Sequence, residues 1–200
     1  VSMNAQRNAS ASQSSLATSM QRLSSGLRVN SAKDDAAGLA IAERMGAQVR
    51  GMNVAVRNAN DAISMSQTAE GALGKVGDML QRMRELAVQS ANATNGTSDR
   101  ANLDAEYTEL AAEIGRTLTS TKFNGQAILA ADSGAKVFQV GANNGDTVTI
   151  TTTNMSTNAG ITAVTGGGVD TLAAANTALT NIDTALDTVN GERALYGASQ

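Results

Sequence analysis

The sequence predicts a mainly α-helical fold, in the form of an elongated antiparallel bundle of long helices with a small β-hairpin region. Apolar residues recur three and four positions apart through most of the chain, which is the pattern of one helix face. The 200 residues include no proline, the residue that most strongly breaks helices. The spacing changes to alternation in one stretch, residues 136–153, where β-branched residues are frequent.

The first two helices are predicted from their apolar spacing and from a capping signal between them. The first ends near Gly26, and its stripe is Leu16, Met20, Leu23 and Leu27. Ser31–Asp34 has the form of a capping box, so a second helix should begin near Ala32. Whether it stops near Gly51 or continues is left open by the sequence. Its inward residues should be Leu39, Ala42, Met45 and Val49.

Acidic residues at the start of the second helix allow two readings. Asp34 and Asp35 could form half of a carboxylate site, but helix capping explains them without a metal. We therefore expect them to cap the helix.

The longest periodic stretch runs from Asn58 to Asn95 and suggests a rod-like helical domain. Its predicted inward residues are Ala59, Ile63, Ser66, Leu73, Val76, Leu80, Met83 and Ala87. The dipeptide Asn95-Gly96 is a turn signal, and a third helix should follow over about Ser98 to Leu118. Its stripe is Leu103, Tyr107, Leu110 and Ile114.

A β-hairpin is predicted next, with strands at Lys136–Val140 and Thr147–Thr153 joined by the loop Gly141–Asp146. Asn154–Asp170 is rich in Thr, Gly and Asn, and we expect a short surface excursion there. A last helix from Leu172 should return to the bundle. Its stripe is Leu172, Ala175, Leu179, Ile182, Leu186 and Val189.

The composition excludes most kinds of catalysis and several kinds of partner. The chain has no His and no Cys, so it has no imidazole base, no thiolate nucleophile and no ordinary zinc site. A net charge of −3 and only four aromatic residues argue against nucleic acid binding. No apolar run approaches the roughly 20 residues of a membrane span. We expect a protein that is not an enzyme, needs no cofactor or metal, and does not insert into membranes.

Several segments together resemble bacterial flagellin. The segment that most closely resembles the family's N-terminal signature is Leu23–Ala42, with the sequence LSSGLRVNSAKDDAAGLAIA. The other similar segments are Arg57–Ile63, Gln67–Leu73, Gln81–Gln89, Thr121–Gly125, Val140–Asp146 and Leu179–Gln200. The resemblance covers residues 1–153 and 176–200, so it is far more specific than one short motif.

The resemblance implies a structural subunit of the bacterial flagellar filament, secreted to the flagellum or cell surface and self-assembling for motility. It implies four regions: 1–31, a partial inner-tube helix and connector; 32–135, the helical core; 136–170, the hairpin and excursion; and 171–200, the start of the C-terminal helix. Family members begin earlier and extend beyond Gln200, so both termini look truncated, and the large variable outer domains of some relatives are absent. We therefore expect residues 1–200 alone to stay monomeric.

The resemblance also implies partners. They are other copies of the chain, an export chaperone, the filament cap and junction proteins, and the Toll-like receptor that senses flagellin. The receptor or subunit interface carried over from the family is Gln81, Arg82, Leu86 and Glu106. Arg82 and Leu86 are four residues apart, so they should present a charge beside an apolar side chain. A solvated helix face is the competing reading of Arg82 and its neighbours. The alternative function is a flagellin-like cell-surface protein that binds glycans or host components.

Overall fold

The computed structural model describes residues 2–200, and the chain divides into two compact units after Val54. The elements in chain order are α1 (Ser2–Ser25), α2 (Ala32–Ser90), α3 (Thr97–Ser120), β1 (Gly134–Gln139), β2 (Thr147–Thr152), the 3-10 turn η1 (Met155–Thr157), α4 (Ala159–Thr165) and α5 (Leu172–Ser199). The predicted mainly helical fold with one small antiparallel hairpin is confirmed. We describe each unit separately, the first up to Val54 and the second from Ala55.

In the first unit, α1 ends where the sequence predicts. Gly26 has a φ of +69°, a conformation that glycine adopts without strain, and its amide donates to the Arg22 carbonyl at 2.9 Å. No residue of α1 is buried. Among the described residues of the first unit, nothing therefore covers the apolar stripe of this helix.

The start of α2 is capped by both acidic residues, in a form that differs from the predicted capping box. Asp34 accepts hydrogen bonds from the Ser31 amide and hydroxyl, both at 3.1 Å, so the hydroxyl donates instead of accepting from a first-turn amide. These bonds, that of the Ser31 hydroxyl first, lower the pKa of Asp34. Asp35 is non-helical (φ −166°, ψ 98°) and accepts from the Gly38 amide at 2.8 Å. Asp35 is thus the N-cap of the continuous helix.

The expected inward stripe at the start of α2 is wrong. Met45 and Val49 are 60% and 59% exposed, Ala42 is also exposed, and Leu39 is only partly buried. The helix does form with the predicted periodicity, but nothing in the described chain covers that face. α2 also continues without a stop through Gly51 to Ser90, which answers the question that the sequence left open.

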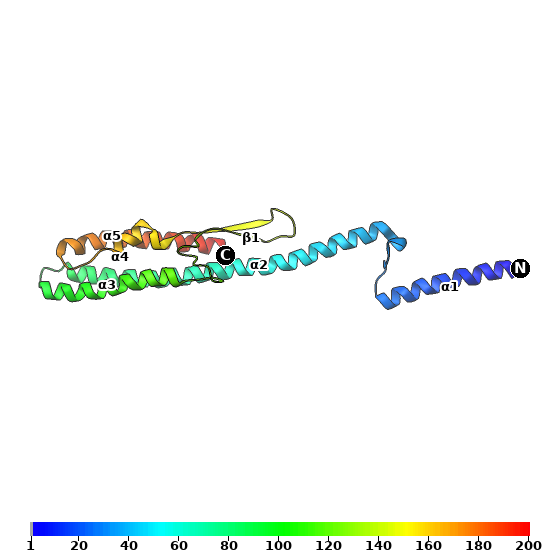
Figure 1. Cartoon of the computed structure of the whole chain (residues 1–200), viewed down its shortest axis with the longest axis horizontal. Coiled ribbons are helices and arrows are strands. Elements are labelled where there is room, and N and C mark those ends of the chain that lie inside the picture. Colours follow the sequence, from blue (N-terminus) through cyan, green and yellow to red (C-terminus); the bar gives the residue numbers. More distant parts are fainter. Residues whose placement is uncertain (1) are drawn as a thin grey trace. The chain divides into compact units, whose positions relative to one another are not determined.

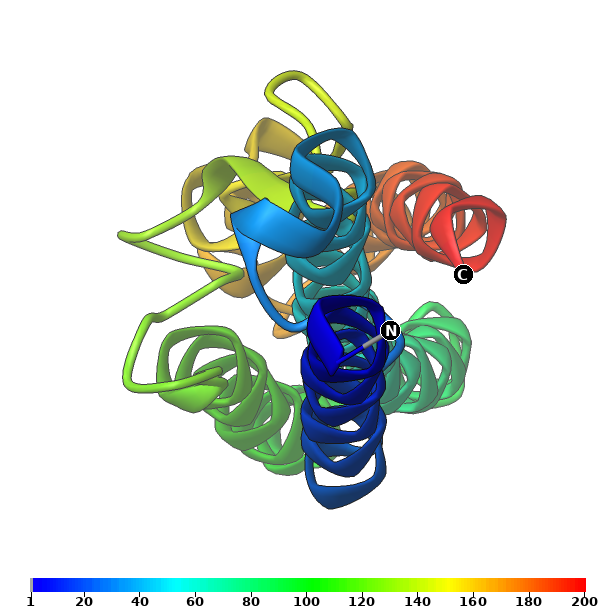
Figure 2. The same cartoon turned by 90° about the vertical axis from the view of Figure 1, so that its right-hand side faces the viewer.

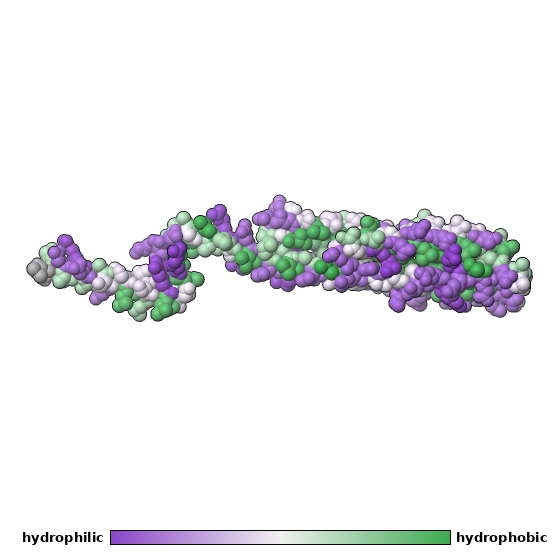
Figure 3. All heavy atoms as spheres, turned by 180° about the vertical axis from the view of Figure 1, so that it is seen from behind, coloured by the Kyte–Doolittle hydropathy of each residue, from purple (hydrophilic) through white to green (hydrophobic). Residues whose placement is uncertain are grey.

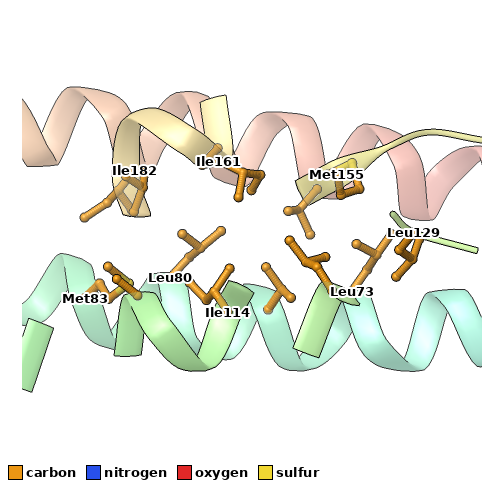
Figure 4. Packing of buried hydrophobic residues seen from close by; sticks show 14 of the residues in the cluster. Leu73, Leu80, Met83, Ile114, Leu129, Met155, Ile161 and Ile182 are labelled. Atoms are coloured by element: carbon orange, nitrogen blue, oxygen red, sulfur yellow. The ribbon is translucent and has the colours of Figure 1, made fainter. Parts of the chain in front are cut away.

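In the second unit, the rest of α2 is flanked by α3 and α5 (Figure 1). Figure 2 views these helices nearly end-on, with α3 in green and α5 in red on different sides of α2. The predicted stripes of α2 and α3 form the centre of the core, where Leu73, Val76, Leu80, Met83 and Ile114 are fully buried. Figure 4 shows Leu73, Leu80, Met83 and Ile114 pointing toward Met155, Ile161 and Ile182 from the other side of the core.

Small residues let α5 lie close to this core. Ala175, Ala178 and Ala185 are buried together with Ile182 and Val189, whereas Leu172 is 48% exposed. The buried face of α5 therefore contains more alanine than the face predicted from its larger apolar residues. Thr171 is the N-cap of α5, and its hydroxyl accepts from the Ala174 amide at 3.1 Å.

The expectation that Asn154–Asp170 is a surface excursion is wrong. This segment forms η1 and α4, and α4 packs on both α3 and α5. Its four largest apolar residues, Met155, Ile161, Val164 and Val169, are at most 2% exposed. Because the segment supplies these side chains, it closes the side of the bundle that α2, α3 and α5 leave open.

Polar groups fasten this segment to the helices. The Tyr107 hydroxyl donates to the Val164 carbonyl at 3.2 Å, and the Val169 amide donates to the Asp104 carboxylate at 2.6 Å. The Ser90 hydroxyl donates to the Val169 carbonyl. Three hydrogen bonds thus join this segment to α2 and α3. Its Gly-rich composition had suggested an irregular structure.

The hairpin has the predicted form, with Phe138 opposite Val148 and Gly134 opposite Thr152. The Asn58 side-chain amide donates to the Gln139 carbonyl at 2.8 Å, which ties the hairpin to α2. Its loop keeps the shape set by Asp146, whose carboxylate accepts from the Asn143 amide at 3.0 Å.

Burial of both tyrosines predicts alkaline destabilisation of the second unit. Burial raises the pKa of Tyr107 and of Tyr196 from 10.0 to about 12. In the unfolded chain these phenols lose their protons near pH 10, so stability should fall as pH rises from about 10 to about 12. The expected loss is about 2 to 3 kcal/mol per tyrosine. Urea unfolding at a series of pH values measures the free energy of unfolding. Tyr107→Phe should remove about half of its fall between pH 10 and pH 12. An unchanged fall would show that Tyr107 does not cause it.

Candidate interaction surfaces

The helices of the first unit carry apolar side chains that face solvent. On α1 they are Leu16, Met20 and Leu23, and on α2 they are Ile41, Met45, Val49 and Met52; we call these seven residues the unit 1 seam. They are 49% to 86% exposed, and Leu23 is the most exposed of them. Green apolar areas interrupt the polar surface of these helices at the left of Figure 3.

The spacing within each helix makes the seam continuous along one face. The steps are four and three on α1, and four, four and three on α2. Burying one Leu, Ile or Met side chain stabilises by roughly 1.5 to 3 kcal/mol. A face of this kind is therefore able to drive helix association once a matching helix is present.

A second surface lies on α2 between α3 and α5, and it is charged. Arg82 contacts α3 through Glu106, with 2.8 Å between Nε and Oε1, and its Nη1 contacts Glu85 on the same helix at 2.8 Å. Arg84 contacts α5 through Asp183, also at 2.8 Å. We call the exposed residues Gln81, Arg82, Arg84, Glu85, Val88 and Gln89, together with Glu106, the α2 charged face.

The structure brings together three of the four residues predicted for a recognition site and separates the fourth. Gln81, Arg82 and Glu106 are exposed on the α2 charged face. Leu86 is 0% exposed, so the expected apolar side chain beside Arg82 is not presented to a partner. The reason is that α3 and α5 flank α2 on two sides. Leu86 lies at the edge of the predicted stripe, yet it is covered as completely as the residues at the centre.

The apolar contribution to this face comes from Val88, which the sequence reasoning missed. Val88 is 52% exposed and lines a shallow hollow of ≈ 380 Å³ together with Gln81, Arg84, Glu85 and Gln89. Val88 is seven residues from Gln81, which is two helical turns, and this spacing was the signal that could have revealed it.

The ion pairs of the α2 charged face hold its side chains in position but add little to folding stability. The carboxylates of Glu85 and Glu106 raise the pKa of Arg82, and that of Asp183 raises the pKa of Arg84. These side chains are about half exposed, and screening by solvent leaves exposed ion pairs of this kind with little effect on stability. A partner with its own carboxylates would therefore displace Glu106 from Arg82 at little cost.

Residues 2–200 contain no cluster of three or more His, Cys, Asp or Glu side chains arranged to hold a metal ion. In the same range, no helix combines the length and apolar character needed to cross a membrane.

Comparison with known proteins gives one consistent result. Residues 1–134 match the family model of the bacterial flagellin N-terminal helical region. The chain is 55% identical over 150 residues to a flagellin of Salmonella paratyphi A, and 51% identical over 158 residues to the B-type flagellin of Pseudomonas aeruginosa. These alignments cover 75% and 79% of the chain but only 30% and 32% of the two relatives.

A solved structure supports the same relationship. The crystal structure of Bacillus cereus flagellin matches with a TM-score of 0.63 and 35% sequence identity. The match covers 71% of this chain and 81% of that one. The chain thus spans about a third of the length of the curated relatives while sharing most of its own fold with a solved flagellin.

Proposed function

The chain belongs to the bacterial flagellin family, and we propose that it is a structural subunit of a flagellar filament that assembles through its unit 1 seam. The function is mechanical: copies pack helix against helix, and the filament they form is extracellular. Flagellins are structural proteins and not enzymes, which agrees with the prediction from the absence of His and Cys.

The single observation that carries this proposal is the contrast between the two units. Leu73, Leu80 and Met83 of α2 are fully buried, whereas Met45, Val49 and Met52 of the same helix are more than half exposed. Both stripes have helical spacing, but only the second unit covers its stripe with its own chain. The uncovered stripe needs helices from elsewhere, and further copies of the chain supply the same apolar face.

Filament formation tests the proposal. The complete reading frame that contains these residues is expressed in a bacterium that lacks its own flagellin, and cells are viewed by electron microscopy. Extracellular filaments and restored swimming are expected. Secretion of the protein without filaments would overturn the proposal. The alternative of a glycan-binding or host-binding surface protein has no observation in its favour among residues 2–200.

The finer partners are proposals as well. We assign an export chaperone and the cap and junction proteins to this chain only because the family membership implies them. For the flagellin-sensing Toll-like receptor, the support is the exposure of Gln81, Arg82 and Glu106 on one face. In this proposal Leu86 shapes the face from beneath and does not touch the receptor.

The substitution Arg82→Ala should weaken activation of the receptor. It removes the guanidinium that joins Glu85 and Glu106, and with it a charged contact at the proposed interface. The half-maximal dose in a receptor reporter assay should therefore rise about tenfold, with helix content unchanged by circular dichroism. The matched control is Arg116→Ala, which removes an exposed arginine of α3 outside this face. Equal dose curves for Arg82→Ala and the unsubstituted chain would refute the role of Arg82.

A further inference from the structure

Four Asn-Gly dipeptides lie in different environments, and this difference has chemical consequences. They are Asn95-Gly96, Asn124-Gly125, Asn144-Gly145 and Asn190-Gly191. In such a dipeptide the glycine amide nitrogen can attack the asparagine side-chain carbonyl carbon, because glycine has no side chain to hinder the approach. The attack requires an amide that is not held in a hydrogen bond and an asparagine free to turn toward it.

Two of the four dipeptides are held in place. The Gly96 amide donates to the Asp99 carboxylate at 3.0 Å, and the Asn95 side-chain amide donates to the Gln89 carbonyl. Asn190 and Gly191 lie within α5, where the helical backbone bonds engage the amide. In both places the attacking nitrogen must first leave a hydrogen bond.

A third dipeptide is partly restrained. Asn124 and Gly125 both have positive φ, +48° and +80°, at the centre of a tight turn. Reciprocal bonds between the backbones of Phe123 and Gln126, at 2.9 and 3.0 Å, close this turn. The turn fixes the asparagine backbone although its side chain faces solvent.

The fourth dipeptide lies in the hairpin loop and, like Asn124-Gly125, has no hydrogen bond among the described residues that holds its reacting groups. Asn144 and Gly145 are exposed, and within residues 2–200 neither the Asn144 side chain nor the Gly145 amide makes a hydrogen bond. A Cβ added at Gly145 would meet no atom within 4 Å, so the space around this backbone is open. The Gly145 φ of +93° is a conformation that glycine accepts and other residues resist.

We propose that Asn144 is a site of spontaneous modification, converting to aspartate and isoaspartate faster than Asn95 and Asn190. The Gly145 amide nitrogen loses its proton to solvent base and bonds to the side-chain carbonyl carbon of Asn144. The bond from that carbon to the side-chain nitrogen breaks, and the nitrogen leaves as ammonia. Water then opens the cyclic imide at either carbonyl, giving aspartate or, with the backbone rerouted through the side chain, isoaspartate. No oxidant or cofactor is needed.

The modification would alter the hairpin loop. It places a new carboxylate beside Asp146, whose own carboxylate accepts from the Asn143 amide at 3.0 Å and from its side chain at 3.2 Å. Isoaspartate also adds one methylene to the backbone of a turn closed by the bond from the Asp146 amide to the Asn143 carbonyl. Like charge and extra length both act to loosen the loop.

Peptide mapping of the full chain tests the proposal. The purified protein is incubated in mildly alkaline buffer, digested at intervals, and analysed by mass spectrometry with enzymatic methylation to mark isoaspartate. Modification at Asn144 should be at least about tenfold faster than at Asn95 or Asn190, since releasing a backbone hydrogen bond precedes reaction there. Equal rates at Asn144, Asn95 and Asn190, or faster reaction at Asn95 or Asn190, would overturn it.

Variants separate the causes. Asn144→Gln should abolish the modification at residue 144, because the longer side chain of glutamine closes the ring poorly. Asn124→Gln should leave the modification at residue 144 unchanged. Asp99→Ala frees the Gly96 amide and should accelerate modification at Asn95, while Asp99→Asn keeps an acceptor and should do so less. If Asp99→Ala does not accelerate modification at Asn95, hydrogen bonding of the glycine amide does not determine which asparagine reacts fastest. None of these readouts depends on filament formation.

Discussion

Leu23→Glu is expected to abolish filament formation while leaving the second unit folded. Leu23 is 86% exposed and belongs to the unit 1 seam, so the free chain loses no packing when it is replaced. In an assembled filament the same position would be covered by another helix. The substitution then forfeits about 1.5 to 3 kcal/mol of apolar burial and adds the larger cost of burying an unpaired carboxylate. Because each contact repeats in every subunit, the critical concentration for assembly should rise at least about a hundredfold.

The control for this prediction is the neighbouring position. Ser24→Glu adds the same charge at the same end of α1 but lies outside the seam. We expect it to assemble at a concentration close to that of the unsubstituted protein, as measured by sedimentation and electron microscopy of the complete reading frame. If Leu23→Glu forms regular filaments at the concentration at which the unsubstituted protein assembles, the unit 1 seam does not drive assembly.

Leu80→Ala is expected to cause a large loss of folding stability in the second unit. Leu80 is 0% exposed and lies in the core near Ile114, Ile161 and Ile182 (Figure 4). Truncating a buried leucine removes its transfer free energy and leaves a cavity, which together cost about 2 to 5 kcal/mol. Urea unfolding should show a lower midpoint with an unchanged slope.

Tyrosine fluorescence makes this measurement specific to the second unit. The chain has no Trp, and both of its tyrosines, Tyr107 and Tyr196, lie in that unit and are buried. The control is Val88→Ala on the same helix, where the side chain is 52% exposed and the loss should stay below about 1 kcal/mol. Equal losses for the two variants would mean that Leu80 is not packed as the structure shows.

The helices and the hairpin were predictable because each is specified by a local pattern. The apolar period of α2 and α3, the Asn-Gly turn at residue 95 and the alternation around Phe138 are all properties of a few neighbouring residues. The capping role of Asp35 was predictable for the same reason, although its hydrogen bond partners were not. The division of the chain into four regions at residues 31, 135 and 170 remains a prediction.

The recognition surface was only partly predictable because exposure depends on neighbouring helices. Arg82 and Glu106 were carried over from the family resemblance, and the structure joins them across two helices. Leu86 shares a helix face with Arg82 by spacing, yet α2 is flanked on two sides and Leu86 is buried. The pairing of Arg84 with Asp183, 99 residues away, has no local signal.

The sequence by itself determined where α1, α2, α3, α5 and the hairpin form, and that the chain has no His or Cys. Only the tertiary structure decided which apolar sides are covered. The stripes at Met45 and Val49 and at Val76 and Leu80 look alike in sequence, but one is exposed and the other is fully buried. Likewise, the Gly-rich segment after the hairpin enters the core through Met155 and Ile161. Periodicity specifies the face that a helix must bury, whereas the partner that buries it comes from residues distant in the chain or from another molecule.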